Sequence, residues 1–103
     1  MKHLGIRIMR SKRTGKRRAY LDIYDQHSRT GAVTSWSEDG RTVTAYFRRH
    51  QVEEHDLSDY RVAVFDSEAP VLSRPPVFDV GTPIPWYKLD VTPADPPEVK
   101  HAS

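Results

Sequence analysis

The sequence of 103 residues contains no cysteine, and this absence removes several classes of site at once. Without thiols the chain can hold neither a disulfide framework nor a cysteine-based zinc site, and it has no cysteine nucleophile. Long apolar runs are also missing, since no window approaches the ~18 consecutive apolar residues of a membrane span. The first residues are charged and lack the apolar segment of a secretory signal. We therefore expect a soluble, cytoplasmic protein that makes no contact with a membrane.

Acidic residues are absent from residues 1–18, which hold eight of the sixteen Lys and Arg residues. The other eight share residues 19–103 with all fourteen Asp and Glu residues. The formal net charge of +2 is thus +8 on the first eighteen residues and −6 on the remainder. A concentrated positive lobe on an acidic body attracts a polyanion to one place, whereas a mixed surface only keeps a protein soluble.

Alternation of apolar and polar residues recurs along the chain and predicts β-strands. The clearest alternating segments are residues 3–9, 19–25, 32–36, 41–49 and 60–66. Asp39-Gly40 lies between two of them and is typical of a hairpin turn. Residues 50–59 lose the alternation, which predicts a turn of helix or an irregular connection, and residues 86–91 predict a last short strand. All eight prolines follow residue 69 and confine that region to edge strands, turns and extended segments.

These patterns predict an all-β fold, either a small OB-like barrel of five or six strands or a curved antiparallel sheet, with a proline-rich C-terminal extension. Closure of a barrel would remove the exposed edges that a flat sheet of this size leaves. A chain of this length forms one domain. We assign residues 1–91 to that domain and residues 92–103 to a flexible, acidic, proline-rich tail.

A basic loop at residues 10–18 leads directly into a segment that carries Tyr20 and Tyr24 on one face. Lys and Arg neutralise phosphates, and aromatic faces stack on unpaired bases with about 1–3 kcal/mol per base. Tyr46 and Arg48 in the second hairpin can extend the same surface. We therefore predict a nucleic-acid-binding face, with single-stranded DNA favoured and low sequence specificity, composed of Arg10, Lys12, Arg13, Lys16, Arg17, Arg18, Tyr20, Tyr24, Tyr46 and Arg48.

Residues 11–26 resemble the basic wing of the gene V type single-stranded-DNA-binding proteins of filamentous phages. The resemblance rests on Ser11-Lys12-Arg13-Thr14-Gly15-Lys16, on Tyr20, and on the pair Asp25-Gln26. It implies a five-stranded OB-like barrel, a homodimer and cooperative coating of single strands. It further implies that Lys12, Arg13 and Lys16 contact phosphate and that Tyr20 or Tyr24 stacks on bases.

The sequence offers little for catalysis, and we expect no enzyme activity, no cofactor and no metal. The glycines are scattered rather than gathered in a phosphate-binding loop, and His50 and His55 lack the spacing of a helical metal site. Two alternatives to nucleic acid stay open. One is a small accessory or inhibitor protein of a phage or mobile element that binds a host protein, and the other is a structural β-domain whose basic loop is a solvated tip.

Overall fold

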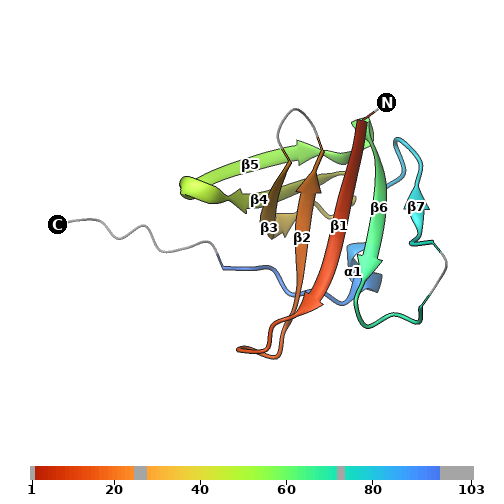
Figure 1. Ribbon diagram of the computed structural model, residues 1–103. Helices are drawn as coiled ribbons and strands as arrows, with labels where there is room; N and C mark the ends of the chain where they lie inside the picture. The colour runs from red at the N-terminus through yellow and green to blue at the C-terminus, as the bar shows by residue number, and fades with distance from the viewer. Residues whose placement is uncertain (1, 25–27, 72–73, 96–103) are drawn as a thin grey trace.

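The computed structural model describes residues 2–24, 28–71 and 74–95 (Figure 1). The all-β fold expected from the sequence is confirmed. In the described residues seven strands form one mixed sheet, ordered β5-β4-β3-β2-β1-β6-β7. The strands are β1 (Lys2–Arg10), β2 (Arg17–Ile23), β3 (Arg29–Trp36), β4 (Thr42–Phe47), β5 (Gln51–Asp56), β6 (Tyr60–Asp66) and β7 (Val77–Phe78). Short helical turns are η1 (Arg48–His50), η2 (Leu57–Asp59) and α1 (Trp86–Leu89).

Neighbouring strands from β1 to β5 pair antiparallel, whereas β6 returns to lie parallel to β1. Two local expectations were wrong. Residues 51–56 form a strand rather than a helical turn or an irregular connection, because they pair with β4 at six positions, and a helical turn follows only at residues 57–59, at the end of the segment. Residues 86–89 form a helical turn rather than a strand. No helix in the described part of the chain combines the length and the apolar character needed to cross a membrane.

The core lies inside a strong curl of the sheet, where β4 and β5 run across the direction of β1 and β2 (Figure 1). Leu4, Ile6 and Ile8 of β1 are at most 1% exposed and lie at its centre. The inward residues of β2, β3, β4 and β6 surround them, and Leu57 of η2 is buried in the same cluster. Alternation thus places one face of every central strand in the core and leaves the opposite face outside.

The C-terminal extension packs on this curled sheet. Trp86 stacks on Trp36, with ring centroids 5.0 Å apart, and Ile84 donates a backbone hydrogen bond to Gly40. Further along, the backbone N–H groups of Thr92 and Ala94 donate to carbonyl oxygens of β2 and β3. The first residues of the segment expected to be a flexible tail are therefore anchored, and residues 96–103 lie outside the described residues.

Gly40 provides a test of how the extension docks. It has a φ of +72° and faces the Ile84 backbone, where the Cβ of an alanine would overlap the carbonyl oxygen. Gly15 has the same φ but no neighbouring atom within 4 Å.

We expect Gly15→Ala to lower the free energy of unfolding by about 1 kcal/mol through backbone strain alone. Gly40→Ala should lower it by about 3 kcal/mol because overpacking adds to that strain. Equal losses in chemical denaturation would contradict this docking.

Candidate nucleic-acid interface

Outward-facing side chains of the central strands form a continuous surface, which we call the outer face. The register places Arg7 of β1 beside Tyr20 of β2 on one side and beside Phe65 of β6 on the other. Tyr20 in turn pairs with Ala32 of β3, and Ala32 pairs with Tyr46 of β4. Residues that are separate in the sequence therefore form one row across five strands. Two of the three predicted stacking residues, Tyr20 and Tyr46, belong to this row.

An ion pair lies at the centre of the outer face. Arg7 donates from Nε to Oδ2 of Asp22 at 2.6 Å and from Nη2 to Oδ1 at 3.1 Å. Thr30 donates to Oδ1 of the same carboxylate at 2.7 Å, and Asp22 is only 7% exposed. The hydrogen bonds to Asp22 raise the pKa of Arg7. The Arg7 guanidinium also lies over the Tyr20 ring, 5.9 Å from its centroid, and so holds this half-buried ring in place.

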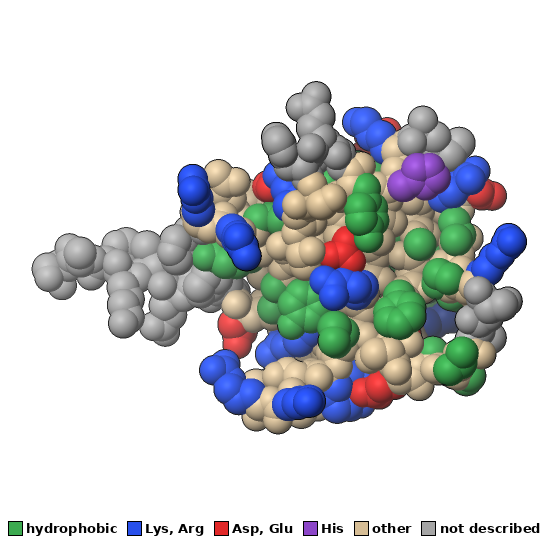
Figure 2. Space-filling model, in the orientation of Figure 1, with side chains coloured by type: hydrophobic (Ala, Val, Ile, Leu, Met, Phe, Trp, Pro, Cys, Tyr) green, Lys and Arg blue, Asp and Glu red, His purple; other side chains and the backbone are tan. Residues whose placement is uncertain are grey.

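Apolar side chains surround this ion pair and remain open to solvent. Tyr24 is 62% exposed, Phe65 and Val77 are each 54% exposed, and Met9 is 44% exposed. Figure 2 shows hydrophobic side chains over β1, β2 and β6, with Lys or Arg and Asp or Glu side chains among them. A contiguous apolar surface on a single sheet face is typical of a binding site. Tyr24, the third predicted stacking residue, stands near the end of β2 remote from the basic loop.

The β1–β2 hairpin tip carries part of the predicted basic loop. Ser11 and Gly15 close the turn through backbone hydrogen bonds, which makes it a projecting hairpin end. Lys12, Arg13 and Lys16 are exposed and form no ion pair with any described residue. Like charges on a short tip repel one another, and a bound polyanion would relieve that repulsion.

The flanking arginines of the same basic loop bind the protein's own chain. Arg10 pairs with Glu68 at 2.6 Å. Arg17 is more enclosed, with 11% of its side chain exposed, and pairs with Asp66 at 2.8 Å. It also donates to the carbonyl oxygens of Leu89 and Asp90, and Arg18 donates to those of Thr92 and Pro93. The basic loop thus has three cations that project and three that bind other parts of the chain. Arg10 and Arg17 pair with carboxylates at the end of β6 and just after it, and Arg17 and Arg18 bind the C-terminal extension.

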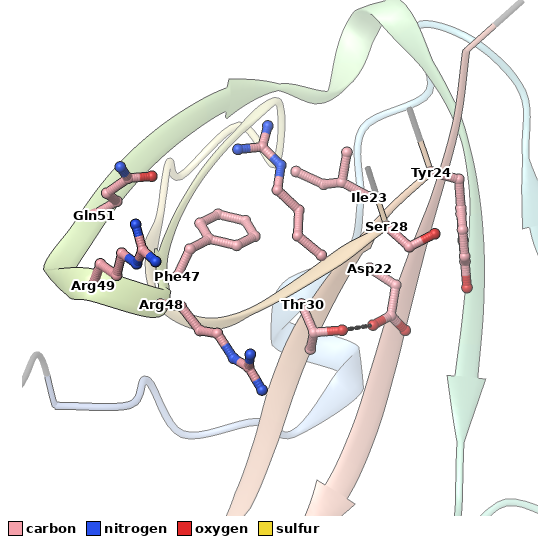
Figure 3. A pocket seen from close by; sticks show the side chains of 10 residues that line it. Asp22, Ile23, Tyr24, Ser28, Thr30, Phe47, Arg48, Arg49 and Gln51 are labelled. Atoms are coloured by element: carbon pink, nitrogen blue, oxygen red, sulfur yellow. Dashed lines mark hydrogen bonds between the residues drawn. The ribbon is translucent and has the colours of Figure 1, made fainter. Parts of the chain in front are cut away.

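A second cationic tip lies at the β4–β5 hairpin. Arg48 and Arg49 are both exposed there, and Arg49 has a left-handed φ of 62°. They line a hollow of about 610 Å³ together with Phe47 and Gln51, while Asp22 and Thr30 lie across it (Figure 3). The nucleic-acid-binding face predicted from the sequence included Arg48 but not Arg49. Two adjacent arginines at a turn between alternating segments would have indicated both. Figure 2 shows Lys and Arg side chains at both hairpin tips, with the hydrophobic side chains of the outer face beside them.

The described residues contain no group of three or more His, Asp or Glu side chains that could hold a metal ion. The surface therefore offers cations, aromatic rings and apolar side chains as its binding groups. No family model, curated protein or solved structure matches this chain. The resemblance to gene V type proteins stays a prediction, and its Asp25-Gln26 pair lies outside the described residues.

The Arg17–Asp66 pair should make stability depend on pH. Its hydrogen bond with Arg17 holds the pKa of Asp66 below the ordinary value of 3.8. A lowered carboxyl pKa stabilises the fold above the unfolded pKa, and this contribution disappears as pH falls through the folded pKa. We expect Arg17→Ala to lower the free energy of unfolding by about 2 kcal/mol at neutral pH, with a smaller difference below about pH 4.

Arg10→Ala is the matched control, because its partner Glu68 is an exposed carboxylate and exposed ion pairs contribute little. Denaturant titrations of both variants across the pH range measure the effect. If the two variants lost the same stability at every pH, Arg17 would not be the clamp described here.

Proposed function

We propose that this protein binds single-stranded nucleic acid, with DNA favoured, across the outer face and between the two hairpin tips. The observation that carries the proposal is the combination of exposed aromatic rings on one face with two neighbouring hairpin tips whose cations form no ion pair with a described residue. Tyr24 and Phe65 supply the rings, and the residues of the two tips supply the cations. Neither feature alone distinguishes nucleic acid from other ligands, whereas a polyanion with flat bases uses both.

The binding mechanism follows from the chemistry of each group. Lys12, Arg13 and Lys16 at one tip, and Arg48 and Arg49 at the other, attract phosphates and release their counterions. Bases then stack on the rings between the tips, and this requires unpaired bases because duplex bases already stack on one another. Four strand spacings separate β6 from β4, a path of roughly 19 Å along the sheet. Contacts to phosphates and to ring faces read no base edges, so most of the bound strand is held with low sequence specificity.

The three projecting cations give the most direct test. We expect conversion of Lys12, Arg13 and Lys16 together to glutamine to weaken binding of a thymidine oligonucleotide strongly at low salt. The slope of log affinity against log salt should fall by roughly 2, the value for three lost contacts to a single strand. Fluorescence anisotropy over a salt series measures both quantities.

The matched control converts Arg41, Arg74 and Lys88 to glutamine, because these exposed residues lie outside both tips and carry the same total charge. If the control lost as much affinity as the tip variant, net charge rather than the tip would explain binding. The same titration tests the homodimer and the cooperative coating that the gene V resemblance implies, since cooperativity steepens the binding curve.

Binding to a host protein is the second candidate, and the exposed apolar side chains around β6 and β7 favour it. Phe65, Val71 and Val77 are all more than half exposed. An accessory or inhibitor protein could dock through them without touching the cationic tips. Recovery of one specific partner after nuclease treatment, together with no oligonucleotide binding, would favour this candidate over the first.

A further inference from the structure

A hollow of about 510 Å³ lies on the outer face over the parallel pair β1–β6. Its floor is formed by two small residues, Gly5 and Ala63, which are directly paired in the register. A Cβ added to Gly5 would make only ordinary contacts, the nearest at 3.6 Å to Asp22 and to the ring of Tyr24. The floor is therefore low because its side chains are small, and the ring of Tyr24 lies against it on the Gly5 side.

Larger side chains border the hollow on every side. Arg7 and Phe65 form the next outward pair along β1 and β6 at one end, and His3 and Arg61 form the corresponding pair at the other end. Tyr24, which directly follows β2, flanks Gly5, and Val77 of β7 is the register partner of Ala63.

The side chains that border the hollow include aromatic rings and, next to them, hydrogen-bond donors. Two rings, Tyr24 and Phe65, can contact a flat ligand, and the volume lies within the range of small-molecule sites. The Arg61 side chain is 40% exposed at the border of the hollow, and its Nε pairs loosely with Asp79 at 3.7 Å. Arg7 uses Nε and Nη2 for Asp22, which leaves Nη1 for another acceptor. A ligand that is both flat and rich in acceptors satisfies the rings and the donors together.

We propose that this hollow holds one unpaired base of the bound strand, an inference that rests on the function proposed above. Base carbonyl oxygens and ring nitrogens accept from Arg61 and Arg7, while the ring stacks or packs against Tyr24 and Phe65. A phenyl side chain of a partner protein fits the same apolar walls but offers no acceptor to the guanidinium groups of Arg7 and Arg61. The hairpin tips contact charged phosphates, whereas this site contacts an uncharged base. Its contribution to affinity therefore does not depend on salt concentration.

Filling the floor tests the site without removing a charge. Ala63→Leu places a bulky apolar side chain in the hollow, and Ser35→Leu adds the same side chain at an exposed position of β3 that does not line it. The probe is a single-stranded oligonucleotide of about 15 nucleotides that carries one fluorescent purine analogue. We expect Ala63→Leu to weaken binding about tenfold with an unchanged salt slope, and to abolish quenching of the analogue. Ser35→Leu should change neither quantity.

Tyr24→Leu provides a second variant that does not depend on how the sheet tolerates leucine at position 63. Tyr24 is 62% exposed, so its loss should leave the folded structure intact, and Tyr87→Leu is its control because Tyr87 is 82% exposed on α1. We expect Tyr24→Leu to reduce affinity and quenching, and Tyr87→Leu to change neither.

The failures of the two proposals are distinguishable. If the wild type binds the oligonucleotide and loses affinity when the tip cations are neutralised, but folded Ala63→Leu and Tyr24→Leu bind normally, the base site and stacking on Tyr24 are overturned, and single-strand binding through the tips stands. If the wild type binds no oligonucleotide, both proposals are overturned. If Ala63→Leu abolishes capture of a protein partner while oligonucleotide binding is unchanged, the occupant is a protein side chain and the base site is overturned.

Discussion

Burial of one face of β1 is the constraint on which the rest of the structure depends. Leu4, Ile6 and Ile8 are the centre of the core, and a shift of one position would turn all three toward solvent. The same alternation obliges Gly5 and Arg7 to face outward. Because β1 lies between β2 and β6, its register also decides which side chains of those strands become its outward neighbours. The outer face is thus a direct consequence of how the core is filled.

The basic N-terminal segment serves two purposes that composition alone could not separate. Arg17 and Arg18 satisfy carbonyl oxygens of the C-terminal extension, and Arg17 also pairs with Asp66, so these charges are used in folding. Lys12 and Arg13 project from the turn, where solvent or a ligand must neutralise them. The positive field that a polyanion meets is therefore narrower than the count of cations suggests, and Arg48 and Arg49 extend it from the opposite hairpin.

Much of the fold could be predicted from local alternation, because half-buried strands leave that pattern in the sequence. The Asp39-Gly40 turn is an example, with its glycine at a φ of +72°. Strand β5 escaped prediction because it pairs through its backbone at the edge of the sheet and needs few apolar side chains. The hollow could not be predicted from the sequence for a different reason. Gly5 and Ala63 are far apart in the chain, and only the parallel pairing of β1 with β6 brings them together.

The central claim is that ligand binding occurs on the outer face between the two hairpin tips. Backbone amide chemical shifts of the protein, followed during titration with a short single-stranded oligonucleotide, test this most directly. The account predicts that the shifts concentrate in β1, β2 and β6 and in residues 12–16 and 48–49, with the Trp36–Trp86 side of the core little changed. Shifts confined to that opposite side, or none at saturating oligonucleotide, would contradict it.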